Sequence, residues 1–300
     1  MLPPRVPLAI DTRRVSAFDG TEIAYHVTRA PRPGAPTVVL ANGLGGTYLA
    51  WRPIIDYLCD RYRFITWDYR GLYESGRPRP DSPPAYRIPN HVRDLASILD
   101  AEGVESASMV GWSMGVQVVL EAFRSMRPRV ANLILLNGTF GRPLDTLTPI
   151  PGMRAVLPSL VDLARRMHAL ATQMTRRATA APEAVGWFKR LGLVGPTLDD
   201  GVFTELVHAF GQLDMEPFFR NLRAIGEHDA ADVLETIDVP ALVITGDKDL
   251  FTPRALAQQM ARRIPTGEIL VVRGGTHYTA VEFPELCCLR IERFYRDHEF

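Results

Sequence analysis

Residues 106–125 read SASMVGWSMGVQVVLEAFRS, and the motif Gly111-Trp112-Ser113-Met114-Gly115 at their centre is the strongest indication of the fold. The motif matches the pattern G-x-S-x-G, and it joins an apolar run typical of a strand (Ser106–Val110) to a helical pattern (Val116–Ser125). A turn this tight leaves no room for side chains at its two glycines, and it strains the residue between them. We therefore predict that Ser113 presents its hydroxyl at the top of a sheet as a nucleophile.

Further apolar runs of the same kind lie on both sides of this motif. The run Thr37–Ala41 is unbroken, without polar alternation, which is typical of a strand buried on both faces of a parallel sheet. The other such runs are Phe64–Trp67, Ala107–Val110, Leu133–Leu136, Leu242–Thr245 and Ile269–Val272. Helical patterns separate them at Tyr48–Tyr57, Ile88–Ala101, Val116–Ser125 and Arg254–Ile264. This alternation predicts an α/β fold with a mostly parallel central sheet and helices on both faces.

Two segments depart from the alternation. Near the start, Val15–Phe18 and Glu22–Val27 flank Asp19-Gly20, a pair that favours a hairpin turn. Between the fourth and fifth central strands, residues 141–232 contain no clear buried strand. Their helical patterns lie around Leu160–Thr175, Pro182–Leu191, Phe203–Leu213 and Glu216–Ile225. So long an insertion predicts a helical cap over 141–232, carried by a core of residues 1–140 and 233–300.

A serine nucleophile needs a base, and the base needs an acid that orients it. The strand at 242–245 runs into Gly246-Asp247-Lys248-Asp249, and the strand at 269–272 is followed by Gly274-Gly275-Thr276-His277. The carboxyl ends of strands are where α/β sheets place their functional groups, so His277 is the expected base. Either Asp247 or Asp249 can supply the acid, because aspartate also forms turns at the ends of strands.

A glycine-rich turn, Asn42-Gly43-Leu44-Gly45-Gly46, follows the strand at 37–41. Such a turn leaves backbone N–H groups free to face a developing oxyanion, and the expected donors are the N–H groups of Leu44 and Met114. Phosphate binding is the alternative use of a glycine-rich turn. The chain contains neither a G-x-x-x-x-G-K-[ST] motif nor a G-x-G-x-x-G motif with a suitably placed acidic residue.

Taken together, these motifs resemble the α/β-hydrolase family, in its serine-nucleophile esterase and lipase-like branch, over roughly Arg14–Phe294. Residues 246–249 are similar to the family's G-x-x-D, which implies that Asp249 is the acid, and Gly275-Thr276-His277 is similar to its histidine loop. Residues 68–75, DYRGLYES, resemble its D-x-R-G-x-G-x-S loop. Two positions differ from the family pattern, with Asn42 where histidine is common and Tyr73 in place of a glycine.

The resemblance implies a serine hydrolase that cleaves carboxylic esters through an acyl-enzyme on Ser113. An acyltransferase, thioesterase, lactonase or perhydrolase would use the same three residues, and a ligand receptor on this fold would lack turnover. We expect a neutral, fairly apolar small-molecule substrate, because no cationic clamp is evident. Residues expected to line its site flank the catalytic groups or belong to the cap: Trp112, Phe140, Phe251, Tyr278, Trp187 and Phe210.

Composition excludes several other classes of protein. Lys plus Arg and Asp plus Glu number 34 each in 300 residues, so the formal net charge is zero, without the basic surplus of a nucleic-acid binder. The three cysteines cannot form a disulfide framework, which favours a reducing, cytoplasmic setting. No apolar run reaches membrane-spanning length, and no metal or cofactor motif is found, so neither is expected. Oligomeric state stays open.

Overall fold

The structure is a computed structural model that describes residues 10–142, 159 and 162–300. Its centre is an eight-stranded sheet with the strand order β1-β2-β4-β3-β5-β6-β7-β8. The strands are β1 Ile10–Ser16, β2 Glu22–Thr28, β3 Thr37–Ala41, β4 Arg63–Trp67, β5 Ala107–Trp112, β6 Val130–Leu136, β7 Ala241–Gly246 and β8 Gly267–Val272. All six predicted central strands and the hairpin are therefore present, although β1 begins upstream of the predicted Val15.

Only the first two strands run against the others. β1 pairs with β2, and β2 with β4, in antiparallel fashion, whereas every pair from β4 to β8 is parallel. In the middle of the sheet Val39 pairs with Ile65 on one side and with Met109 on the other. Because these strands are parallel, the loops that follow β3, β5, β6, β7 and β8 meet at one edge of the sheet.

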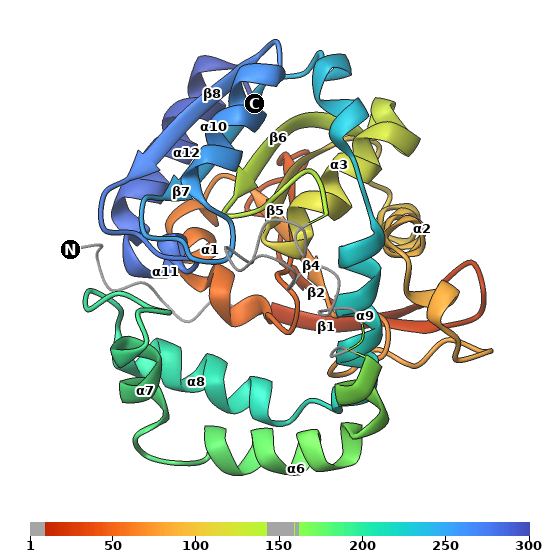
Figure 1. The fold of residues 1–300 in the computed structure, drawn as a ribbon. Coiled ribbons are helices and arrows are strands. Elements are labelled where there is room, and N and C mark those ends of the chain that lie inside the picture. The colour runs from red at the N-terminus through yellow and green to blue at the C-terminus, as the bar shows by residue number, and fades with distance from the viewer. Residues whose placement is uncertain (1–9, 143–158, 160–161) are drawn as a thin grey trace.

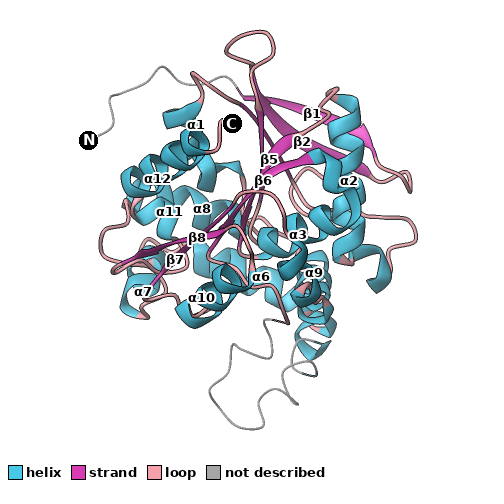
Figure 2. Cartoon of the chain, turned by 90° about the horizontal axis from the view of Figure 1, so that it is seen from above, coloured by secondary structure: helices cyan, strands magenta, loops and turns pink. Residues whose placement is uncertain are grey.

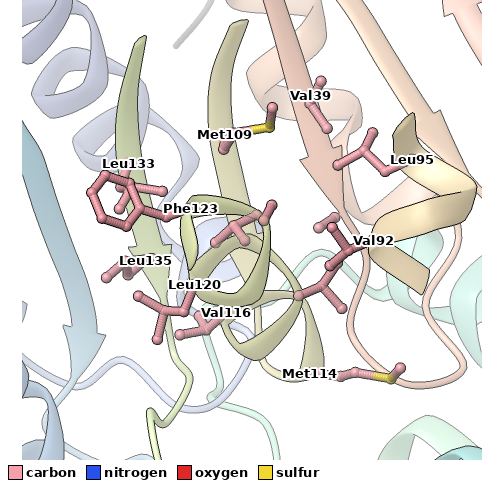
Figure 3. Close-up of a cluster of buried hydrophobic side chains, with 14 of the residues drawn as sticks. Val39, Val92, Leu95, Met109, Met114, Val116, Leu120, Phe123, Leu133 and Leu135 are labelled. Carbon is pink, nitrogen blue, oxygen red and sulfur yellow. The ribbon is translucent and has the colours of Figure 1, made fainter. Parts of the chain in front are cut away.

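Helices cover both faces of the sheet (Figure 2). On one face lie α2 Ile88–Ala101, α3 Met114–Met126 and α10 Arg254–Arg263, and on the other lie α1 Arg52–Leu58 and α12 Pro284–Asp297. Figure 3 shows part of the first core layer, where Leu120 and Phe123 of α3 lie against Leu133 and Leu135 of β6. These apolar layers hold α3 against the sheet, and with it the Ser113 turn that directly precedes the helix.

A second group of helices lies between β6 and β7 in the chain. They are α6 His168–Thr179, α7 Ala184–Arg190, α8 Asp200–Gly211 and α9 Met215–Glu227. In Figure 1, α6, α7 and α8 form a layer below the sheet, and α9 leads back to it. The described part of 141–232 contains no strand, as the sequence predicts, whereas the expected start of a helix at Leu160 lies outside the described residues.

Three details differ from the sequence-based expectations. The helix expected at Tyr48–Tyr57 is a 3-10 turn, Tyr48–Trp51, followed by α1, which has a proline in its first turn. β8 is one of the two edge strands and not a strand buried on both faces, and Ile269 is 39% exposed. The sequence analysis also missed α12, whose buried side chains cover one face of the sheet. No helix among the described residues is long and apolar enough to cross a membrane.

Candidate active site

Ser113 lies at the turn between β5 and α3 in a backbone conformation that serine rarely adopts, with φ 56° and ψ −114°. Both glycines of the motif are sterically required. A Cβ on Gly111 would lie 2.4 Å from the Gly115 carbonyl oxygen, and a Cβ on Gly115 would lie 2.0 Å from that of Ala41. The turn therefore packs directly on β3, and the Ser113 N–H is held by the Leu136 carbonyl at 3.0 Å.

The structure brings Ser113, His277 and Asp249 together. The Ser113 Oγ lies 2.8 Å from His277 Nε2, and His277 Nδ1 lies 2.9 Å from Asp249 Oδ2. A carboxylate accepts hydrogen bonds, so Nδ1 carries the imidazole proton and Nε2 accepts from the serine hydroxyl. His277 and Asp249 are both buried, which shields this chain of hydrogen bonds from water.

Asp249 has a full set of donors around its carboxylate. Oδ1 accepts from the N–H groups of Phe251 and Thr252 at 2.8 and 2.9 Å, and Oδ2 accepts from Thr252 Oγ1 at 2.7 Å. Burial by itself raises the pKa of Asp249, but the hydrogen bonds from His277 and Thr252 outweigh it and hold that pKa below its ordinary value. Asp247 instead accepts from the Gly274 N–H at 2.7 Å, as a turn former.

Asn137 is a member of this site that the sequence analysis missed. Its Nδ2 donates to Asp249 Oδ2 at 2.9 Å and to the Thr276 carbonyl at 3.0 Å, so one amide touches both the acid and the histidine loop. It directly follows β6 and has a left-handed backbone, with φ 42°. The signal that could have found it is its place, since a polar side chain just after a central strand lies at the site edge.

The turn after β3 is held rigidly by Asn42. Its Nδ2 donates to the Trp67 carbonyl at 2.8 Å, and its Oδ1 accepts from Trp51 Nε1 at 2.7 Å. The Leu44 and Met114 N–H groups donate to no acceptor within the described part of the chain. Free N–H groups at a loop and at the start of a helix are suited to binding an oxyanion.

The loop at 68–75 supports this turn from the other side. Arg70 is completely buried and binds Asp94 with two nitrogens, at 2.8 and 2.6 Å. Tyr73 has a φ of 49°, a conformation that glycine adopts more easily. Its hydroxyl donates to the Gly45 carbonyl at 2.5 Å. The residue that departs from the family pattern therefore holds the glycine-rich turn after β3 in place.

Trp112 contacts three parts of the site. Its Nε1 donates to the His277 carbonyl at 2.9 Å. Its ring lies so close to the loop after β3 that a Cβ on Gly43 or Gly46 would approach it to 2.9 or 2.8 Å. Trp112 therefore holds the histidine loop and the glycine-rich loop around the serine turn. It also lines the cavity beside them.

A small apolar cavity of about 120 Å³ lies beside these groups. Its lining comes from the glycine-rich loop, the serine turn, the histidine loop and the helices between β6 and β7: Leu44, Gly45, Gly46, Trp112, Thr179, Phe188, Phe203, Leu206, Val207, Phe210 and Tyr278. None of these residues is charged. Burial raises the pKa of Tyr278, one of these lining residues, to about 12, so its hydroxyl stays protonated.

The other predicted lining residues lie elsewhere. Phe251 does not line this cavity but contacts His277, with its ring centre 5.0 Å from that of the imidazole. Phe140 is buried in the core beside α3, where the guanidinium of Arg263 lies over its ring, so it does not line this cavity as expected. Trp187 is likewise not among the lining residues, and it is 44% exposed.

No group of three or more His, Cys, Asp or Glu side chains that could hold a metal ion occurs among the described residues. No disulfide joins Cys59, Cys287 and Cys288.

Among curated proteins, the chain is similar to proteins named "Putative carbamate hydrolase RutD". That of Caulobacter segnis is 26% identical over 263 residues, covering 88% of this chain and 92% of its own. That of Yersinia enterocolitica is 28% identical over 257 residues, covering 86% of each chain.

Among solved structures, the fold is similar to the enol-lactonase from Burkholderia xenovorans LB400, with a TM-score of 0.75 and 23% identity over 95% of this chain and all of the other. It is also similar to the esterase RhEst1 from Rhodococcus sp. ECU1013, with a TM-score of 0.71 and 23% identity over 94% and 98% of the two chains. A family model described as the alpha/beta hydrolase fold matches residues 36–284, most of the chain. Sequence, topology and this match agree that the protein belongs to the α/β-hydrolase family.

Proposed function

We propose that the protein is a serine hydrolase that cleaves carboxylic esters of small, neutral, fairly apolar compounds. The observation that carries the proposal is the continuous hydrogen-bonded chain from Ser113 Oγ through His277 to Asp249, at 2.8 and 2.9 Å. In this proposal Ser113 is the nucleophile, His277 the general base, and Asp249 the acid that orients the imidazole.

In the first half-reaction the Ser113 Oγ attacks the ester carbonyl carbon while its proton passes to His277 Nε2. The N–H groups of Leu44 and Met114 bind the resulting oxyanion, and a donor of this kind is worth about a hundredfold to a thousandfold in kcat. When the intermediate collapses, the bond to the leaving oxygen breaks, and that oxygen takes the proton from Nε2. An acyl-enzyme on Ser113 and a free alcohol result.

In the second half-reaction a water molecule gives a proton to the same Nε2 and attacks the acyl carbon. Collapse of the second intermediate returns that proton to the Ser113 Oγ and releases the acid. Asp249 stays ionised throughout, since its pKa lies below the ordinary value, and it stabilises the imidazolium formed in each step.

The cavity supports the proposed substrate class. It is uncharged and mostly apolar, and its volume of about 120 Å³ is well below the ~300–1,000 Å³ of pockets for drug-sized ligands. We propose that residues 141–232 act as a cap whose helix α8 forms one wall, because Phe203, Leu206, Val207 and Phe210 all face the cavity.

The test is Ser113→Ala, assayed with short p-nitrophenyl esters and with a fluorophosphonate probe. We expect wild-type protein to turn over the esters and to be labelled, and Ser113→Ala to do neither, because no oxygen remains to attack. Ser125→Ala is the matched control and should behave as wild type, because the hydroxyl it removes from α3 bonds, among the described residues, only to the Glu121 carbonyl.

The same assay distinguishes ester hydrolysis from the alternative reactions that the same three residues could catalyse. The panel includes a lactone, a carbamate and a thioester, since lactonase and carbamate hydrolase are the names of similar proteins. Turnover that persists in Ser113→Ala would refute the mechanism. A wild-type protein inert toward every substrate in the panel and toward the probe would refute the enzyme and leave a ligand-binding role.

A further inference from the structure

Glu282 is a buried carboxylate that the proposed mechanism does not use. It ends the short helix α11, Thr279–Glu282, and its side chain points back toward the histidine loop. Oε1 accepts from Thr276 Oγ1 at 2.6 Å, and Oε2 accepts from the Thr276 N–H at 2.7 Å. Both atoms that it holds belong to the residue directly before His277.

The same carboxylate reaches across to the helices between β6 and β7. Oε1 also accepts from the Gly195 N–H at 2.6 Å, in the loop that joins α7 to α8. Gly195 fits closely there, since a Cβ on it would lie 3.2 Å from Oε1. Glu282 therefore bridges two segments that belong to different layers of the molecule. Thr276 lies six residues before it in the sequence, and Gly195 lies 87 residues before it.

All three partners of Glu282 are hydrogen-bond donors, and it forms no ion pair with any described residue. Burial of a carboxylate is costly, and here only neutral N–H and O–H groups offset that cost. An amide could not make the same three hydrogen bonds, because its NH₂ group would take the place of one carboxylate oxygen and face a donor. The position therefore demands a carboxylate.

We propose that Glu282 is a positioning residue that couples the α7–α8 loop to His277. The α7–α8 loop leads into α8, which lines the cavity, and Thr276 leads into His277 and Tyr278. When α8 lies over the cavity, the Gly195 N–H completes the set of donors on Glu282, which in turn holds Thr276 and hence the imidazole in place. This inference rests on the proposed function only for its effect on catalysis.

The test compares Glu282→Gln with wild type and with Glu285→Gln. Glu285 is exposed, lies three residues further on and forms no described hydrogen bond, so it is the matched control. Amide hydrogen exchange is measured without substrate, in peptides covering 192–198 and 273–279. We expect both segments to exchange at least tenfold faster in Glu282→Gln, with the β-sheet peptides unchanged. One segment loses its acceptor, and the repulsion between the new NH₂ group and that donor displaces the side chain from the other segment.

Kinetics give the second readout. We expect kcat for a p-nitrophenyl ester, and the rate of fluorophosphonate labelling, to fall about tenfold to a hundredfold in Glu282→Gln, as for loss of a hydrogen bond to a charged group. A merely structural role would lower the melting temperature and leave the labelling rate of the folded fraction unchanged. Glu285→Gln should match wild type in every measurement.

A milder variant keeps the proposal falsifiable if Glu282→Gln does not fold. Thr276→Val removes one donor to Glu282, on the histidine side, and the weak acceptor that Thr276 Oγ1 offers the Tyr278 N–H at 3.3 Å, and it leaves the Gly195 contact intact. We expect exchange in 192–198 to accelerate nonetheless, because Glu282 loses an anchor. Acceleration confined to 273–279, or an unchanged labelling rate in a folded Glu282→Gln protein, would overturn the coupling. Since exchange needs no turnover, this result is independent of whether Ser113 is the nucleophile.

Discussion

At the scale of single residues, the site depends on polar side chains placed just after successive parallel strands. Ser113 follows β5, Asn137 follows β6, Asp249 comes after β7 and His277 after β8. Two of them, Ser113 and Asn137, have φ values of 56° and 42°, which are strained for residues with a side chain. Strain concentrated at these positions is what aims their side chains at one another.

Asn137 supplies the residue-scale prediction. Both Asn137→Gly and Asn137→Ala remove the amide that holds Asp249 and the Thr276 carbonyl, and we expect kcat/KM to fall about tenfold to a hundredfold in each. Only Asn137→Ala adds strain at φ 42°, so it should also unfold at a lower denaturant concentration than Asn137→Gly. Full activity in Asn137→Gly would show that the amide does not position the acid.

At the scale of elements, α8 determines the size of the cavity. Its residues Phe203, Leu206, Val207 and Phe210 recur at helical spacing, so that one face of the helix forms the wall. Phe210 lies over the glycine-rich loop, where a Cβ on Gly45 would come within 2.8 Å of its ring. A helix seated this closely leaves space only for a small group beside Ser113.

Removing the Phe210 ring tests this view of α8. We expect Phe210→Ala to prefer longer acyl chains than wild type in a p-nitrophenyl ester series. For the shortest ester that is too long for wild type, kcat/KM should rise about tenfold, since one methylene in a pocket is worth roughly that much. Phe219→Ala deletes the same ring from α9, away from the cavity, and should keep the wild-type profile. An unchanged optimum in Phe210→Ala would contradict the assignment of the cavity.

At the scale of the whole molecule, buried titratable groups make stability depend on pH although the net charge is zero. His91 on α2 is completely buried, and burial, helped by the charge of Arg70, lowers its pKa to about 3. Unfolding restores an ordinary pKa near 6.5. Between these values the unfolded chain binds a proton that the folded chain does not, so the free energy of unfolding falls as the pH drops from 6.5 toward 3.

His91→Gln isolates this contribution. Glutamine can still donate to the Tyr86 carbonyl, which His91 Nε2 contacts at 3.1 Å, but it does not titrate. We expect the free energy of unfolding of the variant to fall less steeply below pH 6.5, by up to about 1.4 kcal/mol per pH unit. The measurement is urea unfolding of both proteins at several pH values. The lowered pKa of Asp249 also reduces the free energy of unfolding in acid, but it does so equally in wild type and variant. Parallel profiles would contradict a buried neutral His91.

Much of this protein could be predicted from local sequence patterns. The six central strands, the hairpin, helix α2 at Ile88–Ala101 and the strand–turn–helix around Ser113 follow from hydrophobic periodicity and from glycines that no other residue can replace. The position of His277 beyond β8 followed from the rule that parallel strands deliver their loops to one edge. These features need only information carried by neighbouring residues.

Tertiary structure decided which side chains meet. It placed Asp249 and not Asp247 beside His277, added Asn137, moved Phe140 into the core and Trp187 to the surface, and joined Glu282 to Gly195. Ser113 and His277 are 164 residues apart in the chain. Periodicity and propensity describe a residue's neighbours in sequence, whereas contacts across such distances arise only when the sheet and its covering helices pack.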